Sequence, residues 1–278
     1  MIDQMNPFAA LQPESSTSEY GVRRKNIWKQ VQQKIADEQL PLQSEKDGMR
    51  LERLASGVAW LDWVPSEWKD IYGALYDEAQ SFQILETEKT KIEKDVHRTF
   101  GLFTRNARIL RLQFRLKMSQ YYESLQAVLI AASHEREYCQ GINFLAAVFL
   151  LSESSERDAF TLLCFLLRHR HLESLFNYRC SSLVEYMKLF EKRLRVNNPF
   201  VYKHFKLVGF GTVCYAIEWF TTCFIVTCPG DLSACVIDLL LAGCEDAMIR
   251  VGLAIIDKLG AHLLKMDLEE LQINFKQV

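Results

Sequence analysis

Two polar stretches of the chain contain side chains that could take part in a reaction if the fold holds them in fixed positions. In the first, Asp95 precedes Arg98 by three residues. On a helix this spacing brings the carboxylate close enough to hold the guanidinium in a chosen direction. Taken alone, the pair is explained more simply as an ordinary surface ion pair, which contributes little to stability.

The second stretch runs from Tyr138 to Asn143 and leads directly into the apolar residues 144–151. A polar turn containing glycine, placed before a buried helix, presents Gln140 and Asn143 at the rigid end of a core element. Such a mounting suits groups that must be positioned. In isolation, helix capping by these two amides is again the simpler interpretation.

The elements that must position these residues are predicted to be helices. From Leu51 onward, apolar residues recur every three or four positions, as on the packed face of a helix. Thr90 and Glu93 have the spacing of a capping box, which predicts a short helix from Thr90 with Arg98 at or just beyond its end. The sequence therefore indicates an all-α fold.

One stretch departs from this helical pattern. Apolar and polar residues alternate from Leu110 to Met118, with the two-residue period of a half-buried strand, so a short irregular or extended insertion near 108–118 stays open. The N-terminal segment, residues 1–50, also differs from the rest of the chain. It begins with a tail rich in Pro, Ser, Thr and Gln, so we expect it to be flexible, with one helical segment. No internal repeat has a fixed period, which disfavours a solenoid.

Composition excludes several classes of protein. With 33 Lys and Arg against 35 Asp and Glu, the chain has no global cationic field for nucleic acid or an anionic membrane, so a partner must be recognised by local shape and chemistry. The eight cysteines show no C-x-x-C pair and no zinc-finger spacing, which predicts reduced, mostly buried thiols in a cytoplasmic protein. No signal peptide is evident, and the apolar stretches 142–151 and 213–228 are too short to span a membrane; both are expected to be core helices.

The two polar stretches, taken in this order and about forty residues apart, resemble the two signature motifs of TBC domains. The first motif, I-x-x-D-x-x-R-T, is met by Ile92, Asp95, Arg98 and Thr99. The second, Y-x-Q, is met by Tyr138 and Gln140, and it is extended by Gly141, Asn143 and Phe144. The likeness covers roughly residues 64–276.

The chain also departs from the family pattern. Lys69 and Gly73 stand where the opening motif has Arg and Trp, and Gly101 stands where a Pro usually follows the first motif. The R-x-W-D helix has Cys235 and Ile237 ahead of its Asp. These differences lie in packing positions, so the resemblance is to a divergent member whose two motif residues, Arg98 and Gln140, are intact.

The resemblance implies a TBC-type helical fold with two helical subdomains over residues 51–278, the change of subdomain falling near 155–195. It implies a GTPase-activating protein that acts on the GTP-bound form of a Rab-type small GTPase and serves vesicle trafficking. Arg98 would be an arginine finger and Gln140 a glutamine finger, both supplied in trans as catalytic residues. Asp95, Tyr138, Asn143 and Thr99 would support them.

No cofactor of its own is expected, because GTP and Mg are carried by the partner GTPase. No independent hydrolase activity is expected either, and no nucleic-acid partner or transmembrane segment. Localisation is expected to be cytoplasmic, and peripheral association with endomembranes through partners stays open. The alternative function is a catalytically weak or inactive TBC adaptor that binds a Rab or another protein.

Overall fold

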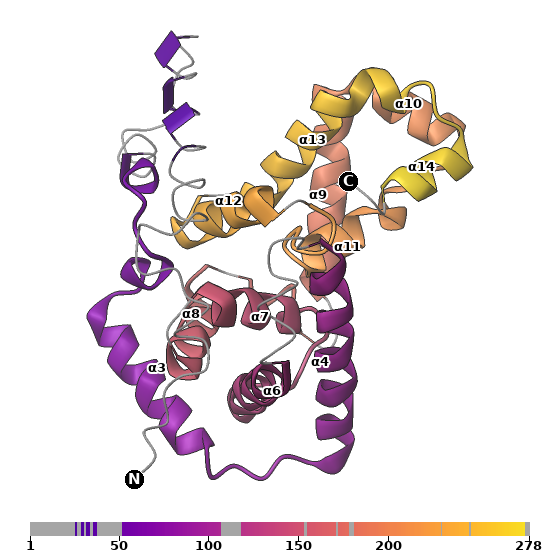
Figure 1. The fold of residues 1–278 in the computed structure, drawn as a ribbon. Helices are drawn as coiled ribbons and strands as arrows, with labels where there is room; N and C mark the ends of the chain where they lie inside the picture. The colour runs from indigo at the N-terminus through magenta and orange to yellow at the C-terminus, as the bar shows by residue number, and fades with distance from the viewer. Residues whose placement is uncertain are drawn as a thin grey trace.

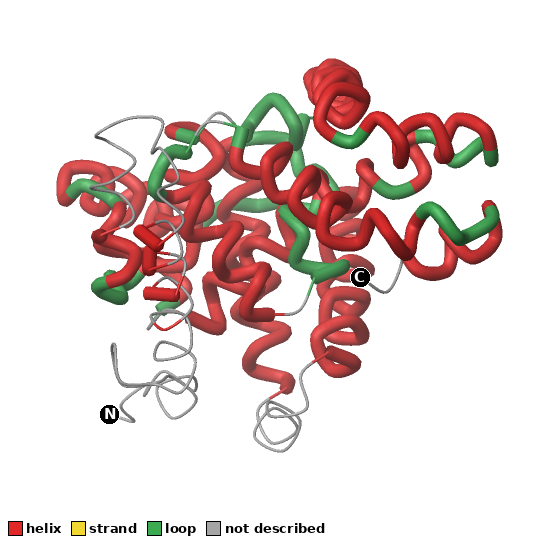
Figure 2. The backbone as a smooth tube through the Cα atoms, turned by 90° about the horizontal axis from the view of Figure 1, so that it is seen from above, coloured by secondary structure: helices red, strands yellow, loops and turns green. Residues whose placement is uncertain are grey.

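The computed structural model describes residues 26, 29–30, 32–33, 36–37, 52–106, 118–152, 155–170, 172–177, 181–228, 230–244 and 246–275. In this part of the chain every regular element is helical, which confirms the all-α fold (Figure 2). The elements in chain order are η1 (Trp60–Trp63), α3 (Ser66–Ala79), α4 (Glu86–Asn106), α6 (Met118–Glu135), α7 (Ile142–Ser152), α8 (Glu156–His169), α9 (Ser181–Asn197), α10 (Pro199–Leu207), η2 (Thr212–Cys214), α11 (Ala216–Thr221), α12 (Gly230–Leu241), α13 (Ala247–Leu263) and α14 (Leu268–Asn274).

The helices gather in two groups that share one buried core (Figure 1). In the first group α8 packs against α3, α6 and α7, while α4 packs against α6 and α7. In the second group α9 packs against α10, α11 and α13, and α12 packs against α13. The short helix η1 joins them, because it contacts both α8 and α12 and the Trp60 Nε1 donates a buried hydrogen bond of 2.7 Å to Asp238 Oδ1.

Helix α7 is the central element of the first group. Its sequence is apolar on all sides, and all but one of the residues 142–150 are buried. A helix that is hydrophobic all round must be covered on every face, and α4, α6 and α8 provide that cover. The turn that enters α7 is therefore attached to a rigid base.

Two expectations from the sequence are wrong in detail. Helix α4 does not begin at Thr90: it begins at Glu86 and continues through Arg98 to Asn106. The Thr90 hydroxyl donates to the Glu86 carbonyl at 2.8 Å, so it bonds within the helix and caps nothing. Stretch 213–228 is no continuous helix either, because α11 ends at Thr221 and the left-handed residues Cys223 and Phe224 turn the chain.

Other expectations lie outside the described residues. The insertion near 108–118 falls there except for Met118, which begins α6. Most of the tail over residues 1–50 falls there as well. The division of residues 51–278 into two subdomains, with a change near 155–195, stays a prediction.

The space beside Gly73, where the family pattern has a tryptophan, is filled by a side chain from another helix. A Cβ added to Gly73 on α3 would lie 2.3 Å from the Arg157 Cζ, so the guanidinium of Arg157 occupies this space. Arg157 also pairs with Asp77 on α3 at 3.4 Å. An arginine from α8 thus takes up volume at the position where the family pattern has a tryptophan, and the α3–α8 contact stays filled.

Candidate functional site

One face of α4 collects the residues of the first motif. Glu88, Ile92, Asp95 and Thr99 are spaced by four, three and four residues, which places them in a single stripe along the helix. Ile92, Asp95 and Thr99 are buried, as expected of a face that packs against α6 and α7. Arg98 lies outside this stripe, and 54% of its side chain is exposed.

The carboxylate of Asp95 joins the two motifs. Its Oδ1 lies 3.3 Å from the Arg98 Nη1, and its Oδ2 accepts a hydrogen bond of 2.8 Å from the Tyr138 hydroxyl. Tyr138 stands two residues before Gln140. The two stretches, distant in the sequence, therefore meet at one buried acid.

Tyr138 acts in this pair as a permanent donor. Burial raises the pKa of its phenol far above the usual value, and the negative charge of Asp95 raises it further. The phenol therefore keeps its proton throughout the physiological pH range. A buried carboxylate needs such partners, because leaving it without them costs more than an ordinary hydrogen bond contributes.

A second chain of hydrogen bonds runs from α4 to the turn before α7. The Thr99 hydroxyl donates to the Asp95 carbonyl at 2.6 Å and accepts from the Asn143 Nδ2 at 2.8 Å. The Asn143 Oδ1 in turn accepts from the Gly141 backbone N–H at 2.8 Å. Because Thr99 and Asn143 are both buried, this chain fixes the turn relative to α4.

Gly141 is required by the shape of this turn. Its φ is +113°, a conformation that favours glycine, and a Cβ at this position would lie 2.3 Å from the Thr221 carbonyl oxygen. The turn therefore lies against the end of α11. Gln140, the residue before it, is exposed to solvent, so its amide is free to meet a partner.

The structure thus brings together the four residues to which the resemblance gives a supporting role. Asp95, Tyr138, Thr99 and Asn143 are buried and hydrogen-bonded to one another or through the backbone. Arg98 and Gln140 are exposed beside them. The expectation that Asn143 is presented like Gln140 is wrong, because its side chain is directed into the protein.

One residue of the site escaped sequence reasoning. The Glu88 Oε1 accepts a hydrogen bond of 3.1 Å from the Tyr138 backbone N–H, fifty residues away in the chain. Glu88 and Asp95 therefore hold the same tyrosine, one by its backbone and one by its hydroxyl. The available signal was the spacing of seven residues, which places both carboxylates on one helix face.

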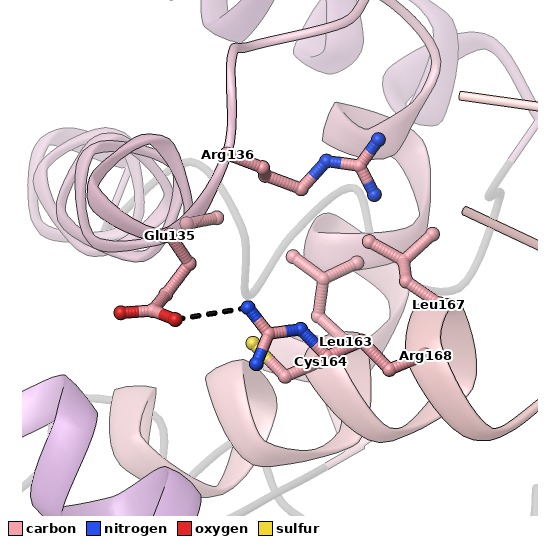
Figure 3. A pocket seen from close by; sticks show the side chains of 7 residues that line it. Glu135, Arg136, Leu163, Cys164, Leu167 and Arg168 are labelled. Atoms are coloured by element: carbon pink, nitrogen blue, oxygen red, sulfur yellow. Dashed lines mark hydrogen bonds and ion pairs between the residues drawn. The ribbon is translucent and has the colours of Figure 1, made fainter. Parts of the chain in front are cut away.

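A small cavity is lined by residues outside the two motifs. A cavity of about 10 Å³ lies between α6 and α8, where Arg168 bonds Glu135 at 2.9 Å beside Cys164 (Figure 3). Space of this size holds about one water molecule. Burial raises the pKa of the Cys164 thiol to about 12, so it stays protonated and unreactive.

Within the described ranges no three His, Cys, Asp or Glu side chains gather as metal ligands. No helix described there combines the length and the apolar character that crossing a bilayer requires. Of the seven described cysteines, four are buried, namely Cys164, Cys223, Cys228 and Cys235.

Removing the Tyr138 hydroxyl tests the link between the motifs. We expect Tyr138→Phe to lower the free energy of unfolding by about 1.5–3 kcal/mol, since it takes a charge-assisted hydrogen bond from a buried carboxylate. Urea unfolding measures this change. Tyr202→Phe is the control, because its hydroxyl bonds Glu191 only at 3.5 Å at a partly exposed position, and we expect a loss below about 1 kcal/mol. Equal losses in the two variants would contradict the assigned role of Asp95.

The fold and the site define a helical domain that presents an arginine and a glutamine from a shared hydrogen-bonded support. Among solved structures the chain is similar to the Chlamydomonas flagellar RabGAP TBC domain, with a TM-score of 0.64 and 19% identity over 95% of this chain and 90% of that one. It is also similar to the Ypt/Rab-GAP domain of Gyp1p, with a TM-score of 0.58 and 15% identity over 92% and 81% of the two chains. At these identities the likeness shows the fold.

The sequence comparisons identify the family. The family description Rab-GTPase-TBC domain matches residues 24–264, and the chain therefore belongs to this family. It is 31% identical over 168 residues to the human ecotropic viral integration site 5 protein homolog, covering 59% of this chain and 21% of that protein. It is 32% identical over 138 residues to the Rab GTPase-activating protein eat-17 of Caenorhabditis elegans, covering 49% and 15%. The matched regions thus span about a fifth or less of these relatives' lengths.

Proposed function

We propose that the chain is a GTPase-activating protein for a Rab-type small GTPase in its GTP-bound form. Arg98 neutralises charge that develops at the β and γ phosphates, and Gln140 orients the attacking water. The observation that carries the proposal is the Asp95 carboxylate, which pairs with Arg98 at 3.3 Å and accepts from Tyr138 at 2.8 Å. A single buried group thereby holds both Arg98 and Tyr138, the residue two positions before Gln140.

Each part of this arrangement suits phosphoryl transfer. A small GTPase hydrolyses GTP slowly because transition-state charge is poorly compensated, and an arginine supplied in trans accelerates the reaction by about 10³ to 10⁵. Such a donor must be exposed yet directed, and Arg98 is half exposed and held by Asp95. Neither Arg98 nor Gln140 has to change its protonation state. GTP and Mg belong to the partner, so this chain needs no cofactor.

The alternative is an adaptor that binds a Rab without catalysis. Its support is the degraded opening motif at Lys69 and Gly73. The Arg157 guanidinium fills the space beside Gly73, so this departure is accommodated at the α3–α8 contact, on helices other than α4 and the turn before α7. Catalysis is therefore the better supported function, and a role in vesicle trafficking at endomembranes follows from the same proposal.

A panel of GTP-loaded Rab proteins tests the proposal. We expect this chain to accelerate phosphate release from at least one of them by about a thousandfold or more. The same panel without the chain gives the intrinsic rates. A Rab that binds the chain in its GTP form, while phosphate release from every member of the panel stays at the intrinsic rate, identifies the protein as an adaptor.

A further inference from the structure

We propose that the outward face of α10 binds an anionic lipid surface directly. The face consists of Phe200, Lys203 and Leu207 on α10, together with Val196 at the end of α9. Phe200, Leu207 and Val196 are 75%, 85% and 70% exposed, far more than a buried core position allows. Helix α10 lies at the far end of α9 and α13, apart from α3 and α6 (Figure 1).

The α10 face is left open by every neighbour of this helix. Phe200, Lys203 and Leu207 are spaced by three and four residues, so they form one stripe. Val201 and Phe205 face the core instead. Other side chains of α10 contact the neighbouring elements. Lys206 pairs with Glu191 of α9 at 2.7 Å, and the His204 Nε2 lies 2.8 Å from the Met266 carbonyl oxygen before α14.

The segment that contains α10 and the second half of α9 is more basic than the rest of the chain. Residues 188–213 contain six Lys or Arg and one acidic residue, Glu191, although the whole chain has 33 basic and 35 acidic residues. Lys206 and Arg193 pair with Glu191 and Asp246. The four other cations of this segment, Lys188, Lys192, Arg195 and Lys203, have exposed side chains and form no ion pair with any described residue.

This combination fits a bilayer of acidic lipids better than a second copy of the chain. Protruding Phe and Leu side chains enter the boundary between headgroups and acyl chains, while neighbouring lysines attract anionic headgroups. A second copy placed on the same face would bring Lys203 against its own equivalent. The α10 face also lies on a helix at one end of the molecule (Figure 1).

Co-sedimentation of the full chain with lipid vesicles tests the proposal. We expect binding to vesicles of phosphatidylcholine with phosphatidylserine, weakening with added salt, and little binding to phosphatidylcholine alone. Phe200→Ser with Leu207→Ser should weaken binding by at least about tenfold. Lys203→Glu should weaken it by at least about fivefold, since each cation near an anionic surface contributes about this factor.

Two matched variants serve as controls. Leu85→Ser removes a side chain that is 73% exposed, and Lys69→Glu reverses a charge on α3, remote from α10. Both should bind vesicles like the unmodified chain, and helical circular dichroism should show that all variants fold. GTPase stimulation in solution should be unchanged in the α10 variants, so a failure of vesicle binding is distinguishable from a failure of the proposed function.

Three outcomes would overturn the proposal. They are equal binding to the two kinds of vesicle, undiminished binding by the α10 variants, and a change from dimer to monomer in Phe200→Ser with Leu207→Ser without any vesicle binding. The last outcome would make the α10 face an interface between copies of this chain.

Discussion

Replacing Arg98 by lysine should lower the stimulated rate of GTP hydrolysis by about a thousandfold or more. A lysine keeps the positive charge, but its compact ammonium cannot span two phosphate oxygens as a planar guanidinium does. The loss corresponds to about 4 kcal/mol of transition-state stabilisation. Single-turnover phosphate release with a responsive Rab measures it.

Folding should be almost unaffected by the same change. Arg98 is half exposed, and a lysine keeps a positive charge beside the Asp95 carboxylate, so we expect a loss of about 1 kcal/mol or less in the free energy of unfolding. Arg250→Lys is the control, since Arg250 is an exposed arginine on α13, a helix that contains no residue of either motif, and it should retain full activity. If Arg98→Lys or Arg98→Ala stimulates hydrolysis almost normally, Arg98 is no arginine finger.

Gln140→Ala should abolish activity on a Rab that lacks its own switch glutamine. If this chain supplies the amide that orients water, the unmodified protein still turns over such a Rab appreciably. Once Gln140 is also removed no amide is left, and we expect a loss of at least about a hundredfold, as for a positioned transition-state donor. Phosphate release from the altered Rab, with each form of the chain, gives the comparison.

The control for Gln140 is Gln83→Ala, which removes another exposed amide, from the loop before α4. It should behave as the unmodified chain on both Rab forms. Should the altered Rab resist the unmodified protein completely, the two-finger mechanism fails, and the exposed amide of Gln140 has no role in orienting water.

The helices and the support of the site could be predicted because buried residues recur with the helical period. The stripe of Ile92, Asp95 and Thr99 on α4 follows that period, and all four supporting residues are buried. The exact start of α4 could not be predicted. A threonine three residues before a glutamate caps a helix or bonds within one, and only the backbone decides, here through the Thr90 hydroxyl bond to Glu86.

Contacts between distant segments were equally out of reach. The Glu88 carboxylate bonds the backbone of Tyr138, and a backbone N–H leaves no trace in residue type. Cys223 and Phe224 take left-handed conformations, with φ of 47° and 63°, inside an apolar run that reads as a helix. Both side chains are fully buried there, so packing of the surrounding core outweighs local preference.

The contact between Gly141 and Thr221 means that the segment containing both motifs depends on a later part of the chain for its geometry. A fragment that ended after α8 would contain Arg98, Gln140 and every residue of their hydrogen-bonded support. It would lack the α11 carbonyl against which the glycine turn is seated, 2.3 Å from where a Cβ would stand. A shortened form of the chain can therefore contain both motifs and still hold Gln140 in the wrong place. Matches to the two motifs alone are thus a poor guide to which truncated forms are active.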